Sequence, residues 1–354
     1  MKKLLLGTRK GLVVCEKQNG NWQIKTTHFI GIPVSMVYTD NDTKTWWACL
    51  DHGHWGVKMH KSKDEGKTWE EIEAPIYPKG SMVNDDKEAS LRYIWAFNKV
   101  NDTLLLGTDP GGLFEGDENG KSFELNKGLW NHPSRKENWF GGGRDMPGIH
   151  SICINPKDSN HAYVGISCAG VFETRDAGET WYPKNKGLKA DFLPDPDAEV
   201  GQDPHLLVMH PENPKLMWQQ NHCGIFKSED AGENWFDISE KEGPANFGFA
   251  IELNPNNENM AWVAPAISDG IRAAIDGKLQ ICRTDDGGKT WQSYSKGLPQ
   301  ENCFDIVYRH CLKYNGEDLV FGTTTGNLFV SSNLGESWNC ISNYLPMIYC
   351  VHFV

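Results

Sequence analysis

One short turn sequence recurs along the chain and constrains the fold more than any other feature. Its clearest copy, residues 284–291, reads TDDGGKTW: a small polar residue, an Asp two positions later, a Gly two beyond that, then Thr and Trp. The Asp can accept hydrogen bonds from backbone N–H groups of its own turn, and the Gly can adopt the positive φ of a tight hairpin. The Trp begins the next strand, where its large apolar surface can wedge between neighbouring sheets. Each copy is therefore read as a structural hairpin turn.

Further copies of this turn are spread along the sequence at intervals of roughly 46 to 58 residues, which is the range of propeller-blade repeats. Three are close matches: SKDEGKTW at 62–69, TRDAGETW at 174–181 and SEDAGENW at 228–235. Three are weaker: SSNLGESW at 331–338, GDENGKSF at 116–123 and EKQNGNW at 16–22.

Short apolar runs bounded by glycines and turn residues precede each copy, as expected for β-strands. Two such runs come directly before every copy, and most copies have a third, more distant run. These more distant runs lie at 34–40, 92–98, 150–156, 205–211, 249–255 and 306–312. The first copy lacks one, but the C-terminal run MIYCVHFV at 347–354 can supply it. The sequence thus predicts an all-β fold over residues 1–354, a single seven-bladed β-propeller domain closed by the C-terminal strand pairing with the N-terminal blade.

Composition limits the classes of partner that the protein can bind and indicates its cellular compartment. The net charge of −12 argues against nucleic acid or an anionic membrane surface as the main partner. No apolar run approaches the length of a membrane span, and the first residues, MKKLLLGTRKG, read as a strand rather than as a leader. The ten cysteines show no CxxC pair, which favours reduced thiols and a cytoplasmic location.

One face of such a propeller is expected to carry function. With the strands of a blade named A to D from the axis outward, the repeated turn joins C to D. The B–C turns and D–A loops then gather on the opposite face, together with the longest loops, 73–90, 126–148 and 184–204. The catalytic candidates at these positions are Asp51, His52, Arg92, Asp305 and Arg309. The substrate-binding candidates are Arg9, Lys10, Trp55, Asp109, Arg144 and Asn221.

Histidines are the second signal on this face. Of the 12 in the chain, five fall at axis-facing positions: His52, His54, His150, His205 and His222. Because imidazole is the commonest metal ligand in proteins, we expect a divalent transition metal, with Zn the best match and Mn, Fe or Cu as alternatives. The predicted ligands are His54, His150, His205, His222 and Gln219. The alternative is a metal-free polar pocket whose histidines are hydrogen-bonded separately.

The repeated turn resembles the Asp-box, or bacterial neuraminidase repeat, of β-propellers. The wider pattern, with DHGHWG, DPGGLF, NHCGIF and FGFAIELNP, resembles uncharacterised bacterial repeat proteins described as sialidase-like or glycosyl-hydrolase-like. Sialidases have six blades and an Arg-Ile-Pro motif, whereas this chain has seven repeats and Gly31 where that Arg would stand. The resemblance therefore implies a propeller but not a sialidase.

Three functions remain open on the sequence alone. The first is a metal-assisted hydrolase or lyase that acts on a polar small molecule or carbohydrate. The second is a non-catalytic scaffold or assembly factor that binds a protein partner. The third is a glycosidase that relies on two carboxyl groups.

Overall fold

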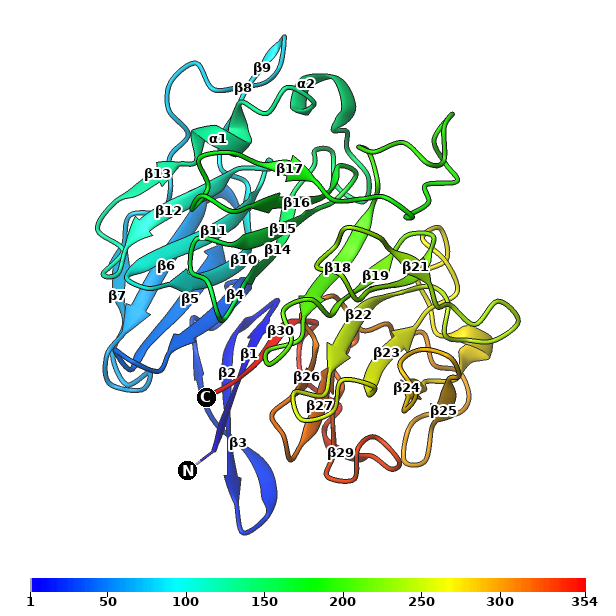
Figure 1. The fold of residues 1–354 in the computed structure, drawn as a ribbon. Coiled ribbons are helices and arrows are strands. Elements are labelled where there is room, and N and C mark those ends of the chain that lie inside the picture. Colours follow the sequence, from blue (N-terminus) through cyan, green and yellow to red (C-terminus); the bar gives the residue numbers. More distant parts are fainter. Residues whose placement is uncertain (1) are drawn as a thin grey trace.

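Seven four-stranded antiparallel sheets form a ring in the computed structural model, which describes residues 2–354 (Figure 1). The first strands of successive sheets contact one another around the axis, from β4 (Val34–Asp40) through to β30 (Ile348–Phe353) and back to β4. The predicted seven-bladed β-propeller is confirmed. No helix in the described residues is long and apolar enough to cross a bilayer.

The four strands of each blade follow one another from the axis outward. Blade 1 consists of β30, β1 (Lys3–Thr8), β2 (Gly11–Gln18) and β3 (Asn21–His28). Blade 2 consists of β4, β5 (Thr45–Asp51), β6 (Val57–Ser62) and β7 (Glu70–Ile72). Blade 3 consists of β10 (Tyr93–Val100), β11 (Thr103–Asp109), β12 (Leu113–Asp117) and β13 (Phe123–Leu125). Blade 4 consists of β14 (Ile149–Ile154), β15 (Ala162–Ile166), β16 (Gly170–Thr174) and β17 (Tyr182–Pro183).

The remaining blades have the same order. Blade 5 consists of β18 (Pro204–Met209), β19 (Met217–Asn221), β20 (Gly224–Ser228) and β21 (Phe236–Asp237). Blade 6 consists of β22 (Gly248–Leu253), β23 (Ala261–Pro265), β24 (Ile281–Thr284) and β25 (Gln292–Tyr294). Blade 7 consists of β26 (Leu312–Tyr314), β27 (Leu319–Gly322), β28 (Leu328–Ser331) and β29 (Asn339–Ser342). The loops add α1 (Lys127–Trp130), α2 (Arg135–Asn138), the 3-10 helices η1 (Gly53–Trp55) and η2 (Ile275–Gly277), and a hairpin of β8 (Met82–Asn84) and β9 (Lys87–Glu88).

The repeated turn is built from hydrogen bonds within its own few residues. In the copy at 62–69, the Ser62 hydroxyl donates to Asp64 and accepts from the Gly66 N–H. Gly66 has a φ of 84°. The Thr68 N–H and hydroxyl donate to the two carboxylate oxygens of Asp64, and these bonds lower the pKa of Asp64 to about 2. Equivalent bonds occur in the copies that start at Thr174, Ser228, Thr284 and Ser331.

The tryptophan that ends the turn joins neighbouring blades. The Trp235 indole of blade 5 donates to the Lys184 carbonyl of blade 4, and the Trp291 indole of blade 6 donates to the Ile238 carbonyl of blade 5, each at 2.8 Å. Trp235 is 2 % exposed. The sequence-based expectation that these side chains wedge between sheets agrees with this packing.

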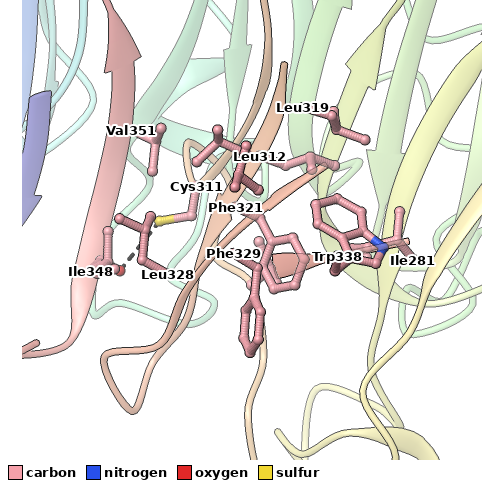
Figure 2. Packing of buried hydrophobic residues seen from close by; sticks show 14 of the residues in the cluster. Ile281, Cys311, Leu312, Leu319, Phe321, Leu328, Phe329, Trp338, Ile348 and Val351 are labelled. Carbon is pink, nitrogen blue, oxygen red and sulfur yellow. Dashed lines mark hydrogen bonds between the residues drawn. The ribbon is translucent and has the colours of Figure 1, made fainter. Parts of the chain in front are cut away.

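The C-terminal strand closes the ring as predicted. β30 pairs antiparallel with β1, from Leu4 opposite Phe353 to Thr8 opposite Ile348. Figure 1 shows β30 in red beside β1 in blue. On its other side, Ile348 packs into the core of blade 7, and its carbonyl accepts a hydrogen bond from the Cys311 thiol at 3.3 Å (Figure 2). β30 is thus held by backbone pairing with β1 on one edge, and on the other by apolar packing and by the Val351 N–H, which donates to the His310 carbonyl.

The innermost strand of blade 7 differs from the prediction. The sequence predicts a strand at 306–312, but β26 begins only at Leu312. Before it the chain turns, with the Cys311 N–H bonded to the Tyr308 carbonyl. Tyr308, Arg309 and His310 all line a cavity on the propeller axis, and three consecutive side chains cannot share one face of a regular strand.

Closure is tested by a pair of glycine substitutions. Gly326 has a φ of 92°, and a Cβ there would fall against the Leu345 carbonyl oxygen just before β30. Gly316 has a φ of 90° but open space, its nearest neighbour being the Asn256 amide at 3.8 Å. Because backbone strain is common to both, we expect Gly326→Ala to lower the free energy of unfolding by about 1–3 kcal/mol more than Gly316→Ala. Urea unfolding measures both.

Equal losses in the two variants would contradict a role for this contact in closure. Truncation after Leu345 removes β30 entirely and is expected to prevent folding to a soluble ring. A soluble truncated protein with an unchanged melting temperature would disprove the closure.

Candidate functional site

A cavity of about 500 Å³ opens on the propeller axis. It lies on the face opposite the repeated turns, because B–C turns and D–A loops supply much of its wall. The loop at 126–148 supplies Phe140 and Arg144, the loop at 184–204 supplies Phe192 and Asp203, and the blade 6 insertion supplies Asp269 and Arg272. The floor is formed by residues in or beside inner strands: Tyr93, Trp95, His205, Phe249, Arg309 and His310.

Three potential metal ligands converge in this cavity. Asp203, His205 and His222 each place one ligand atom within 4.8 Å of the others. Asp203 Oδ2 lies 3.4 Å from His222 Nδ1 and 3.7 Å from His205 Nε2. Asp203 and His205 are buried, whereas the His222 side chain is 26 % exposed and its Nε2 lies 3.7 Å from Asp269. We call Asp203, His205 and His222 the acid–histidine cluster.

Backbone groups orient the cluster. The Cys168 N–H donates to Asp203 Oδ1 at 3.0 Å, which fixes the carboxylate just before β18. His205 Nδ1 lies 2.6 Å from the Gly248 carbonyl oxygen. Because a carbonyl only accepts, Nδ1 carries the proton and the lone pair of His205 is on Nε2, on the side of Asp203. The His205 ring is also stacked on Phe249 at 4.6 Å.

These surroundings set the charge of each group. Burial alone would raise the pKa of Asp203, but the His222 imidazole and the charge of Arg309 hold it well below its usual range. Asp203 in turn raises the pKa of His222, whereas burial lowers that of His205. At neutral pH the cluster therefore contains a carboxylate, a neutral His205 and a His222 that binds a proton more readily than usual.

A second buried carboxyl group lies at the edge of the cavity. Asp109 is fully buried, and Arg144 Nε lies 3.1 Å from its Oδ2 in an ion pair without hydrogen-bond geometry. The Arg144 guanidinium lies over the Tyr93 ring at 4.3 Å. Burial raises the pKa of Asp109 despite the charge of Arg144.

The structure brings some of the sequence-predicted site residues together. Four of them line the cavity: His205, His222, Arg144 and Arg309. Asp109 lies behind this wall, in an ion pair with Arg144. His150 lies deeper along the axis, where its Nδ1 is 2.8 Å from the Ser151 hydroxyl.

Other predicted ligands and binding residues lie elsewhere. Gln219 and Asn221 are buried in β19, where the Asn221 amide donates to Gln219 Oε1 at 3.1 Å. His54 and Trp55 are exposed on η1 of blade 2, with their rings 5.3 Å apart. Neither Gln219 nor His54 belongs to the acid–histidine cluster, because one is bonded within its strand and the other is carried outward by its turn.

The remaining candidates are also outside the cavity wall. His52 and Trp55 line a separate cavity of about 290 Å³, and Asp51 ends β5 beside it. Arg92 pairs with Asp145 at 3.1 Å. Asp305 accepts hydrogen bonds from the Thr325 N–H and the Asn327 amide, so it shapes the β27–β28 turn. Arg9 and Lys10 are exposed in the β1–β2 turn.

The sequence reasoning missed three charged residues of the cavity, Asp203, Asp269 and Arg272, and also its tyrosines Tyr93, Tyr308 and Tyr349. A signal for Asp203 existed, because Asp203 and His205 are two apart at the start of a strand, where such residues share a face. Asp269 and Arg272 lie in the long insertion at 267–277, whose path no pattern determines.

The curated proteins that are similar to this chain match it over only part of its length and over a smaller part of their own. No protein-family model matches the chain. The chain is 26 % identical over 210 residues to the oligoxyloglucan-reducing end-specific xyloglucanase of Emericella nidulans, covering 54 % of this chain and 24 % of that protein. It is 24 % identical over 160 residues to a corresponding xyloglucanase of Neosartorya fischeri, covering 42 % and 18 %. The matched regions are thus about a quarter or less of these relatives' length.

Solved structures share the fold over more of the chain. The periplasmic gluconolactonase of Pseudomonas aeruginosa has a TM-score of 0.60 at 13 % identity, covering 100 % of this chain and 99 % of that one. YCF48 from Cyanidioschyzon merolae has a TM-score of 0.58 at 16 % identity, covering 92 % and 89 %. The GH74 enzyme of Niastella koreensis has a TM-score of 0.54 at 12 % identity, covering 98 % and 65 %. At such identities the likeness establishes the fold alone.

The coupling between Asp203 and His222 gives a pH prediction. A raised folded pKa means that His222 contributes stability below its unfolded pKa, near 6.5, and that this contribution is lost as the pH rises through the folded value. Asp203→Asn should lower the His222 pKa and weaken that pH dependence, since Asp269 remains beside the ring. An NMR titration of the histidine rings in chelator-treated protein measures the pKa, with His222→Gln to assign the signal.

Asp269→Asn is the matched control, because Asp269 also lies beside His222 but is exposed. Its effect on the His222 pKa should be smaller. An unchanged His222 pKa in Asp203→Asn would contradict the coupling.

Proposed function

We propose that the chain is a metal-assisted hydrolase that acts on a polar molecule of sugar size in the axial cavity. The observation that carries this proposal is the acid–histidine cluster facing the cavity. One carboxylate and two imidazoles suit Zn or another divalent transition metal, and three protein ligands leave a coordination position for water or substrate.

The donor set fits a metal in two further respects. The Cys168 N–H and the Gly248 carbonyl orient Asp203 and His205, as the outer hydrogen-bond partners of ligands do in metal sites. The unprotonated Nε2 of His205 is also on the side of Asp203, so no deprotonation is needed for it to bind. A metal held there would supply an activated water or polarise a carbonyl.

The rest of the wall is suited to a hydroxylated ligand. Tyr93, Tyr308 and Tyr349 line the cavity and offer hydroxyl groups, and Trp95 offers an aromatic face. A concave cavity with a few polar groups at fixed positions is typical of small-molecule sites. The volume of about 500 Å³ is in the range of such sites, and these residues would bind and orient the substrate beside the cluster.

The comparisons support a hydrolase. The curated relatives are named as xyloglucanases, and a structure that matches the full chain is named as a gluconolactonase. Both names refer to enzymes that act on carbohydrates or molecules derived from them.

Elemental analysis tests the metal. We expect about one equivalent of Zn, Mn, Fe or Cu in the wild-type protein, and a loss of most of it in His205→Ala and His222→Ala. His54→Ala is the matched control, because this exposed histidine should not affect the metal content. Equal metal content in His205→Ala, or none in the wild type under any loading condition, would contradict the proposal.

Hydrolysis is tested with aryl esters, sugar lactones and aryl glycosides. Activity should be lost on chelation, return with the metal found by analysis, and be absent from His205→Ala. Activity that survives chelation would point to a different chemistry.

A glycosidase without metal is the second candidate, favoured by the two buried carboxyl groups. Their surroundings move the pKa of Asp203 well below its usual value and that of Asp109 above it. A pair of carboxyl groups whose surroundings move their pKa values apart is what glycoside hydrolysis uses. This candidate predicts chelator-resistant hydrolysis of an aryl glycoside that is lost in both Asp109→Asn and Asp203→Asn.

Protein binding is the third candidate. One structural neighbour is YCF48 bound to D1 peptide, with a TM-score of 0.57. Exposed apolar side chains on the loops of blades 1 and 2 favour this role for the chain: Ile30 is 80 % exposed, Trp55 70 % and Ile76 75 %. Loss of a captured partner on Trp55→Ala, with the fold intact, would support it.

A further inference from the structure

An arginine that forms no ion pair among the described residues lies at the floor of the axial cavity. The Arg309 guanidinium lies over the Trp95 ring at 4.8 Å and over the Phe249 ring at 5.3 Å. Its Nε is buried and has no hydrogen-bond partner among residues 2–354. The side chain as a whole is only half-buried, because the rest of it faces the cavity.

The surrounding residues do not neutralise this charge. Asp203 is near enough to attract Arg309 but forms no ion pair with it in the described part of the chain. The Asp203 carboxylate is instead engaged by the Cys168 N–H and the two histidines. Contacts with aromatic rings offset only part of the desolvation of a cation. The desolvation of the Arg309 guanidinium is therefore not offset by an ion pair among residues 2–354.

We propose that Arg309 binds an oxyanion group of the ligand, a carboxylate or a phosphate, so that the cavity selects small acidic molecules such as sugar acids or sugar phosphates. The description of this molecule as a substrate rests on the proposed function, whereas the binding of the anion does not.

The geometry suits such a group. With rings against the guanidinium, the open approach is along its N–H edge, where two parallel hydrogen bonds to an oxyanion can form. Arg272, whose guanidinium lies 5.5 Å from the same Phe249 ring, adds positive charge near the mouth and attracts anions. Arg144 is already paired with Asp109, whereas no ion pair engages the Arg309 guanidinium among residues 2–354.

Binding of three matched probes tests the proposal. Isothermal titration calorimetry is carried out with D-glucuronate, D-glucose 6-phosphate and D-glucose, which share a ring and differ in the acid group. We expect at least one acid to bind the wild-type protein about tenfold or more tightly than glucose, since hydrogen bonds to charged groups are worth at least that factor. Glucuronate or glucose 6-phosphate as the preferred probe identifies the group as a carboxylate or a phosphate.

Two variants of Arg309 distinguish direct hydrogen bonds to the acid from a general attraction by the positive charge of the cavity. Arg309→Met should abolish the preference for the acid, and Arg309→Lys should retain only part of it, because an ammonium lacks the planar fork. Arg272→Gln is the matched comparison: it removes a nearby positive charge that attracts anions, so it should reduce the preference for the acid by less than Arg309→Met does, and an equal loss in the two variants would overturn a direct contact with Arg309.

The melting temperature distinguishes ligand binding by Arg309 from a structural role, because a structural role would make Arg309→Met less stable. Because Arg309→Met removes a charge that has no ion-pair partner among residues 2–354, its melting temperature without ligand should equal or exceed that of the wild type. A lower melting temperature with an unchanged acid preference would overturn the proposal, as would a wild-type protein that prefers neither acid over glucose. If Arg309→Met does not fold, the binding of Arg309→Lys decides.

Metal analysis of the same preparations keeps the two proposals apart. An acid preference that depends on Arg309 in a protein that binds no metal would refute the proposed metal-assisted hydrolase and leave this inference standing. If the acid–histidine cluster binds metal but the protein shows no preference for either acid, this inference is refuted and the proposed metal site stands.

Discussion

The pairing of β30 with β1 is the constraint on which the rest of the structure depends. The inner strands contact one another in a closed circuit, so the axial cavity exists only when all seven are in place. The closure and the site also share a segment of chain. Cys311, which bonds to the Ile348 carbonyl of β30, is two residues from Arg309 on the cavity floor. A change at the closing strand is therefore transmitted to the site over a very short path.

The fold could be predicted because its information is local. The hydrogen bonds of the repeated turn, such as those from Thr68 to Asp64, lie within one short stretch and leave a recognisable pattern. The closure followed from counting strands, because one blade lacked an inner strand and one C-terminal run had no blade. The innermost strand of blade 7 could not be predicted, because the apolar run at 306–312 suits a strand but its residues must face the cavity in succession.

The site was predictable only in part. His205, His222 and Arg309 were found because their place in the repeat puts them at the axis. His54 has an equivalent place in blade 2, yet η1 leaves it exposed, because the distance from the axis depends on the length and path of each turn. Asp203 shapes the charge of the whole cluster, but it follows an irregular loop. Repeat position thus predicts which face a residue is on, but not how far from the axis it lies.

The two inner strands of blade 1, β30 and β1, are far apart in the sequence, and this affects how the ring forms. Leu5 pairs with His352, so β1 lacks its inner neighbour until almost the whole described chain has been synthesised. Until then its unpaired backbone edge is open to other strands. Partners at such large sequence separation also meet slowly, since loop closure must precede the contact. The cavity therefore cannot be complete before the last strand of the described chain is available, and until then the open edge of β1 is a place where mispairing can begin.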